Sequence, residues 1–295
     1  MATSGIELDE RDPAIHPGDD LYRHMNGLWL KRSVIPEDKS RYGAFTIIAE
    51  EAEQAVREIL EEASLAPAGS EAWKAGQLYR SFMDEDRIEA VGLTPLIAEL
   101  EALDVALAKG KGALARELGR LERSGMEGLW QLFIDNDPGD PERYVVFVEQ
   151  AGIGLPDEAY YREDSFAAIR DAYLAHIERM FVLVGLDEPG LRAGNVMAVE
   201  TALASHHWDN VKCRDAEATY NPMSGEDLAT RMGDFPFSAW REASGIGDDK
   251  FAHVIVRQPS FVDALSQVWT ECSAAQLRDW MAWSLIKSFS PYLPQ

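Results

Sequence analysis

Leu129-Trp-Gln-Leu-Phe-Ile134 and Tyr144-Val-Val-Phe-Val148 are two short runs that are rich in β-branched and aromatic residues. They flank Asp135-Asn-Asp-Pro-Gly-Asp-Pro141, a segment whose residue types favour turns. This arrangement predicts an antiparallel β-hairpin over about residues 129–148. The other ordered segments have helical periodicity, so we predict a mainly α fold, a multi-helical lobe with this small hairpin as an insertion.

Helical periodicity is clearest in the segment that begins at Phe45. Its apolar residues recur every three or four positions, and glutamates occupy much of the rest of the helical wheel. This pattern predicts an amphipathic helix with a solvated acidic face. Similar spacing predicts helices over about residues 21–30, 73–83, 94–110, 114–121, 166–184, 194–209, 261–269 and 277–285.

The segments outside these helices are predicted from turn-forming residues and capping patterns. Residues 1–20 are polar and rich in Pro, Asp and Gly, which predicts an irregular lead-in to a helical region over 21–295. Tyr220-Asn-Pro-Met223 is predicted to be a loop. The spacing of a capping box occurs twice, in Ser224 with Asp227 and in Ser273 with Gln276.

Composition and charge exclude several classes of protein. The chain has 295 residues, of which 46% are hydrophobic and 27% are charged, as in a soluble folded protein. Lys and Arg number 28 against 51 Asp and Glu, which gives a formal net charge of −23 at pH 7. Because this charge repels phosphate backbones and anionic membrane surfaces, we expect neither nucleic acid nor a membrane as a partner.

The sequence also bears on the compartment. The N-terminus has no basic segment followed by an apolar one, and apolar stretches such as Met180–Leu186 are much shorter than the roughly 20 residues that cross a bilayer. We expect a protein without a membrane anchor that is cytoplasmic, or exported without a cleaved signal peptide. Cys213 and Cys272 are too few for a disulfide framework, which suits a reducing compartment, although a single bridge between them stays open.

The residues taken alone indicate no catalytic centre. No HExxH, GxSxG, GxGxxG or GxxxxGK[ST] motif is present. His206 and His207 are adjacent, so on a helix they point about 100° apart and cannot chelate one ion together. We expect them to pack at a helix end near Trp208. Cys213 is close to them in sequence, but no spacing rule supports a Cys/His pair.

Several longer strings occur in order along nearly the whole chain. They are Asp19-Asp-Leu-Tyr-Arg-His-Met-Asn-Gly-Leu-Trp-Leu-Lys31, Ile35-Pro-Glu-Asp-Lys-Ser-Arg-Tyr-Gly-Ala-Phe45, Gln150-Ala-Gly-Ile-Gly-Leu-Pro-Asp-Glu-Ala-Tyr-Tyr161, Glu200-Thr-Ala-Leu-Ala204, Arg214-Asp215, Tyr220-Asn-Pro-Met223 and Trp283-Ser-Leu-Ile-Lys-Ser-Phe-Ser-Pro-Tyr-Leu293. The first three resemble the DDFYxxxxGxWL, IPxxxSRYGxF and GLGLPxxxYY segments of the neprilysin and endothelin-converting-enzyme family of zinc metalloendopeptidases. The set as a whole resembles the N-terminal region of this family, and the absence of a membrane anchor makes the chain most similar to its soluble bacterial, particularly actinobacterial, members.

Members of this family continue into a catalytic half that carries HExxH, a later ExxxD and an NAY or NAF substrate clamp, and all three are absent here. The resemblance therefore implies an N-terminal fragment or truncated gene product that forms most of the helical lobe capping the catalytic cavity. It implies that zinc is the cofactor of the full-length enzyme, with ligands outside this chain. We expect the chain alone to be inactive, with no catalytic residue, no metal ligand and no cofactor.

The resemblance also assigns one substrate-binding residue. In SRYGxF the family's Arg faces the cavity and pairs with the free carboxylate of a peptide substrate, and this Arg falls on Arg41. A guanidinium suits this role because it can donate two parallel hydrogen bonds to a carboxylate. The alternative is a surface Arg beside glutamates such as Glu37. Some relatives have an acidic residue where this chain has Thr46, which puts an Arg/Asp pairing at this subsite in doubt.

Two functional hypotheses follow. The first is the N-terminal lobe of a zinc metalloendopeptidase, which encloses the cavity and limits substrates to short peptides. Its partners are then peptide substrates and the missing C-terminal catalytic half, in cis or supplied in trans. The alternative is a stand-alone peptide- or protein-binding regulatory protein derived from that lobe. If the lobe packs against a catalytic half, this chain exposes apolar surface.

Overall fold

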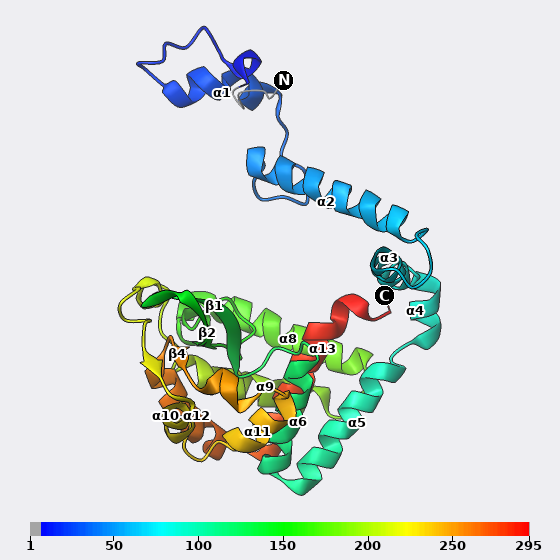
Figure 1. The fold of residues 1–295 in the computed structure, drawn as a ribbon, viewed down its shortest axis with the longest axis vertical. Helices are drawn as coiled ribbons and strands as arrows, with labels where there is room; N and C mark the ends of the chain where they lie inside the picture. The colour runs from blue at the N-terminus through cyan, green and yellow to red at the C-terminus, as the bar shows by residue number, and fades with distance from the viewer. Residues whose placement is uncertain (1–6, 295) are drawn as a thin grey trace. The chain divides into compact units, whose positions relative to one another are not determined.

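The computed structural model describes residues 7–294, and the chain divides into two compact units, Met1–Asp84 and Glu85–Gln295 (Figure 1). The predicted fold class, mainly α with a small β insertion, is confirmed. The helices of the first unit are α1 (Leu21–Arg32), α2 (Ala44–Ala63) and α3 (Glu71–Phe82). Those of the second are α4 (Glu85–Val91), α5 (Thr94–Lys109), α6 (Lys111–Arg123), α7 (Ala159–Arg162), α8 (Ala167–Leu183), α9 (Pro189–Ala204), α10 (Gly225–Arg231), α11 (Phe237–Ser244), α12 (Pro259–Glu271) and α13 (Ala274–Phe289). Over residues 7–294, no helix combines the length and the apolar character needed to cross a bilayer.

Residues 7–20 contain one short 3-10 helix, Leu8–Glu10, and are tied to α1 by polar contacts. Asp12 is buried, and its carboxylate accepts hydrogen bonds from Lys31 Nζ (2.5 Å) and the Ala14 N–H (3.1 Å). Asp20 caps α1 by accepting from the Arg23 N–H (2.8 Å). Residues 1–6 of the predicted lead-in lie outside the described residues.

Residues 7–84 of the first unit have no hydrophobic core of their own. Of its described residues, 7–84, only Asp12, Gly27 and Gly76 are buried. The apolar positions that predicted the amphipathic helix now lie on α2, and Phe45, Ile48, Val56 and Ile59 are all more than half exposed. Helices α2 and α3 nevertheless approach closely where Gly76 of α3 faces Ser64, the C-cap of α2. A Cβ on Gly76 would lie 2.2 Å from the Ser64 nitrogen.

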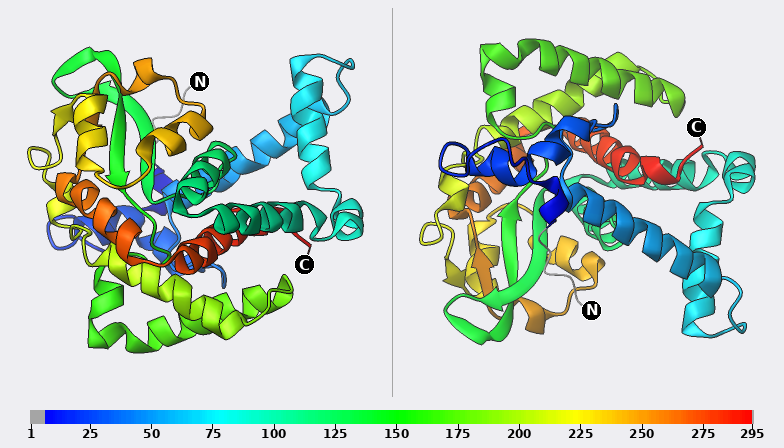
Figure 2. Two further views of the ribbon diagram at one scale, coloured as in Figure 1. Left: turned by 90° about the horizontal axis from the view of Figure 1, so that it is seen from below. Right: turned by 90° about the horizontal axis from the view of Figure 1, so that it is seen from above.

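The hydrophobic core lies in the second unit, with α13 at its centre. Every residue of α13 from Leu277 to Ile286 is buried. The helix packs against α9, α5, α6 and α8, and Figure 2 shows it in red between α5 and α8. Both predicted capping boxes are present, one at Ser224 before α10 and one at Ser273 before α13.

The predicted hairpin is formed by β1 (Trp130–Asp137) and β2 (Asp140–Gln150), which pair antiparallel. They belong to a four-stranded sheet of order β1-β2-β4-β3, in which β2 and β4 (Val254–Val256) are parallel. The prediction of a loop over Tyr220–Met223 is wrong in its second half, because Pro222 and Met223 form β3 and pair antiparallel with β4. A two-residue strand is stabilised by its distant partner and has no local signal of its own.

Helices α6 and α11 pack closely against each other at Gly119 of α6. A Cβ on Gly119 would lie 2.2 Å from the carbonyl oxygen of Trp240 and 3.1 Å from the Ser244 nitrogen. These are backbone atoms of α11, so they can move only if the helix moves. Gly112 lies on the same helix α6, and a Cβ there would meet open space.

Gly119→Ala should therefore lower the free energy of unfolding by about 1–3 kcal/mol, because the added methyl group forces α6 and α11 apart. Gly112→Ala is the matched control and should raise it by about 0.5–1 kcal/mol, through a better helix propensity. Urea titration followed by far-ultraviolet circular dichroism measures both. Equal effects of the two substitutions would contradict the close packing of α6 on α11.

Candidate functional site

Arg41 lies in the segment between α1 and α2, two residues before Gly43, the N-cap of α2. It is exposed, and within residues 7–294 it makes no hydrogen bond and no ion pair. The alternative, a surface Arg beside glutamates such as Glu37, therefore stays open as well. The substrate-binding role of Arg41 stays a prediction.

The residues on either side of Arg41 are held by one carboxylate. Glu50 of α2 contacts Lys39 Nζ through Oε1 (3.1 Å) and accepts a hydrogen bond from the Tyr42 hydroxyl through Oε2 (3.3 Å). The hydrogen bond and charge of Glu50 raise the pKa of Lys39. Sequence reasoning did not single out Glu50, because it is one of several glutamates on the acidic side of α2 and carries no local signal.

The Gly-Leu-Pro and Tyr-Tyr string forms a buried hydrogen-bond network with Glu200 of α9. The Tyr161 hydroxyl donates to Glu200 Oε2 (2.6 Å) and accepts from the N–H groups of Gly154 (3.1 Å) and Leu155 (2.9 Å). Tyr173 donates to Glu200 Oε1 (3.0 Å) and accepts from Trp283 Nε1 of α13 (2.8 Å). Burial raises the pKa of Glu200. The hydrogen bonds of Glu200 are made to side chains of this chain, and they attach the loop after β2 to α9.

The same network explains on steric grounds why residue 154 is a glycine. A Cβ at this position would lie 1.9 Å from the Tyr173 hydroxyl oxygen. Gly152 has a φ of +90°, in the left-handed region that favours glycine. Steric crowding at Gly154 and a left-handed backbone at Gly152 are therefore the physical reasons for glycine at these two positions.

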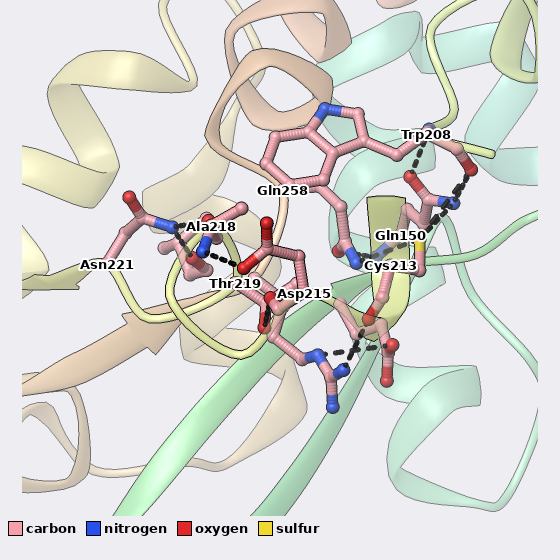
Figure 3. A network of polar contacts seen from close by, with 11 residues as sticks. Gln150, Trp208, Cys213, Asp215, Ala218, Thr219, Asn221 and Gln258 are labelled. Carbon is pink, nitrogen blue, oxygen red and sulfur yellow. Dashed lines mark hydrogen bonds and ion pairs between the residues drawn. The ribbon is translucent and has the colours of Figure 1, made fainter. Parts of the chain in front are cut away.

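A second polar network holds the loop between α9 and β3 (Figure 3). Gln150, at the end of β2, accepts from the Trp208 N–H (2.7 Å) and donates to the Trp208 carbonyl (2.9 Å). The Gln258 side chain accepts from the Gln150 N–H (2.9 Å), and both amide groups lie 3.6 Å from Cys213 Sγ. Desolvation raises the pKa of the Cys213 thiol, which is the opposite of what an activated nucleophile needs.

The adjacent histidines follow the end of α9 at Ala204, and both are half-buried; His207 has structural contacts. Its Nε2 lies 3.0 Å from the Ala151 carbonyl oxygen, and its ring packs edge-on against Phe261. Burial lowers the pKa of His207 to about 4. Cys213 and Cys272 are both free thiols, so the single bridge that the sequence left open is not formed.

Asp137 is a buried carboxylate with three hydrogen-bond partners, and sequence reasoning did not identify it. It is fully buried near the tip of the hairpin and accepts hydrogen bonds from Arg143 Nη2 (2.5 Å), the Gly139 N–H (2.8 Å) and the Tyr220 hydroxyl (2.8 Å). The Arg143 contact does most to lower the pKa of Asp137 to about 2. The hint in the sequence was Tyr220, which begins one of the family strings but has no partner that sequence alone reveals.

A cavity of about 450 Å³ lies between the end of α6 and the segment after β2. Glu122 lines it, and its Oε2 accepts a hydrogen bond from Trp240 Nε1 (2.6 Å). Its Oε1 is buried without a partner among the described residues, and burial raises the pKa of Glu122 to about 8.

A metal site is not found in the part of the chain that the structure describes. Over residues 7–294, no three His, Cys, Asp or Glu side chains are grouped so that they could hold a metal ion. The side chains described above therefore do not fit a catalytic zinc, which needs three protein ligands around one point.

The sequence model of the N-terminal part of peptidase family M13 matches residues 17–295, nearly the whole chain. The chain belongs to peptidase family M13. Among its M13 relatives, membrane metallo-endopeptidase-like 1 of Homo sapiens is 31% identical over 77% of this chain and 31% of its own length. Endothelin-converting enzyme-like 1 of Rattus norvegicus is 26% identical over 96% of this chain and 38% of its own. The chain thus spans about two fifths or less of the length of these curated relatives.

Solved structures agree with this assignment. The zinc metalloprotease ZMP1 of Mycobacterium tuberculosis, in complex with an inhibitor, matches with a TM-score of 0.89 and 39% identity. The match covers 99% of this M13 chain and 45% of the ZMP1 chain. PepO from Lactobacillus rhamnosis, at 20% identity and a TM-score of 0.74, shares the fold.

Tyr161→Phe should lower the free energy of unfolding by about 1–3 kcal/mol, because it leaves Glu200 Oε2 and two backbone N–H groups without their buried partner. Tyr160→Phe is the matched control, since the Tyr160 ring stacks on Phe166 and its hydroxyl has no hydrogen-bond partner within residues 7–294. The control should change stability by less than about 0.5 kcal/mol. Thermal and urea unfolding of both variants measure the difference, and equal stability of the two variants would refute a structural role for this network.

Proposed function

We propose that this M13 chain is the N-terminal, mostly helical lobe of a zinc metalloendopeptidase, and that it encloses the catalytic cavity and limits substrates to short peptides. The main support is the likeness to the zinc metalloprotease ZMP1, which extends over 99% of this chain but only 45% of the ZMP1 chain. A lobe that encloses a cavity excludes water and large substrates from it.

The exposed face of α2 supports a partner that covers it. Phe45 is 91% exposed, and Ile48, Val56 and Ile59 follow it at helical spacing on a helix that no buried apolar side chain of residues 7–84 supports. Contiguous apolar surface of this kind marks an interaction site. We propose that the C-terminal catalytic half of the same protease, in one polypeptide or supplied separately, is that partner.

Arg41 is the residue we propose for substrate contact. It is exposed, it has no ionic partner within the described chain, and its neighbours are held in place by Glu50. A guanidinium in this state is available to form a bidentate pair with the free carboxylate of a short peptide.

We assign the zinc to the catalytic half, because the described residues of this chain offer no ligand set for it. When bound there, zinc would polarise the scissile carbonyl and activate the attacking water. The contribution of the present residues is to bind and enclose the peptide.

The purified chain should show no peptidase activity and should contain far less than one zinc per chain. A quenched short peptide as substrate and elemental analysis of the dialysed protein measure the two properties. Adding the separately expressed catalytic half of an M13 protease that lacks its own lobe should produce turnover that a chelator abolishes. Chelator-sensitive turnover by the chain alone would overturn the proposal.

A further inference from the structure

Glu50 joins α2 to both sides of the Arg41 position. Its two carboxylate oxygens are used separately, Oε1 by Lys39 (3.1 Å) and Oε2 by Tyr42 (3.3 Å). These partners stand two residues before and one residue after Arg41 in the sequence. A single side chain on a regular helix therefore restrains the irregular segment that carries Arg41.

The charges around this segment are distributed unequally. Lys39 is compensated twice, by Glu50 and by Asp38, whose Oδ2 lies 3.9 Å from Lys39 Nζ. Arg41, two residues later, has no such compensation among residues 7–294. The two oxygens of Glu50 contact Lys39 and Tyr42, and neither contacts Arg41 among the described residues.

We propose that Glu50 is a positioning residue for Arg41: it anchors the segment through Lys39 and Tyr42, and because its carboxylate is directed at these two partners, the Arg41 guanidinium stays free for a carboxylate ligand. This inference rests on the proposed function, in which Arg41 binds the free carboxylate of a short peptide. It adds to that function the three residues, Glu50, Lys39 and Tyr42, that position the Arg41 guanidinium.

The two contacts can be separated by substitution. Glu50→Gln keeps an oxygen that can accept from Tyr42 but removes the charge that holds Lys39, and Glu50→Ala removes both contacts. Lys39→Met leaves Glu50 with an uncompensated oxygen, which can then compete with the ligand for Arg41. In the double variant Lys39→Met/Glu50→Gln that competing charge is gone, so its ligand binding should recover relative to Lys39→Met alone. A purely structural role for the ion pair does not predict this recovery.

The test uses the 295-residue chain with 15N-labelled arginine, and the ligands are an N-acetylated tripeptide with a free carboxyl terminus and its C-terminal amide. The shift of the Arg41 Nε–Hε signal reports binding. Glu51→Gln is the matched control, because Glu51 is the next residue of α2 and is exposed. The unsubstituted chain and Glu51→Gln should bind the free acid and discriminate against the amide.

We expect Glu50→Ala to weaken free-acid binding by about tenfold, which corresponds to about 1.4 kcal/mol. Glu50→Gln should weaken it less, and binding of the amide should not change. Equal affinities of Glu50→Ala and Glu51→Gln for the free acid would overturn the proposal. Failure of Lys39→Met/Glu50→Gln to bind better than Lys39→Met would overturn the part that concerns competition.

Failure of the proposed function gives a different result. If the unsubstituted chain does not distinguish the acid from the amide, the assignment of Arg41 as the carboxylate ligand fails. The role of Glu50 is then decided by 15N relaxation of the Arg41 and Tyr42 amides. Increased backbone motion in Glu50→Ala but not in Glu51→Gln supports the anchoring, and unchanged motion in both variants overturns it.

Discussion

Helix α13 is surrounded by protein on all sides from Leu277 to Ile286. The arrangement of residues 85–294 depends on the ion pairs and hydrogen bonds that satisfy two charged side chains within this buried stretch. Arg278 and Asp279 lie within the buried stretch, where an unpaired charge would be strongly destabilising. Arg278 contacts Asp104 of α5 (2.8 Å), while Asp279 accepts from Arg192 (2.5 Å) and Asn195 (2.8 Å) of α9. These pairs fix the neighbours of α13, and through Trp283 and Tyr173 the same helix reaches the Glu200 network.

Residues 7–84 present the opposite situation. Their helices are well formed, but no apolar side chain among them is buried, so the free energy that usually stabilises helices in proteins is missing from this unit. Arg41, the residue proposed to contact substrate, belongs to this unit, and its neighbours Lys39 and Tyr42 are restrained by polar contacts to Glu50. The proposed association with a catalytic half would bury α2 and stabilise the helix on which the Arg41 segment is anchored.

The sequence predicted the fold class, the hairpin and both capping boxes because each has a local signal, such as the turn residues at 135–141 or Ser273 three residues before Gln276. It did not predict α11, β4 or the strand at Pro222, whose stabilising contacts are distant in sequence. For the candidate site, Arg41 came from a family resemblance. Glu50 and Asp137 could not be found, because their roles depend on partners brought together only by folding.

The central claim is that residues 85–294 form a self-supporting lobe, whereas α2 needs a surface from outside residues 7–84. Hydrogen–deuterium exchange of the chain alone, resolved by mass spectrometry, tests this claim most directly. The amides of α13 and α9 should exchange only through global unfolding, and those of α2 should exchange orders of magnitude faster. Protection of α2 equal to that of α13 in the isolated chain would contradict the account.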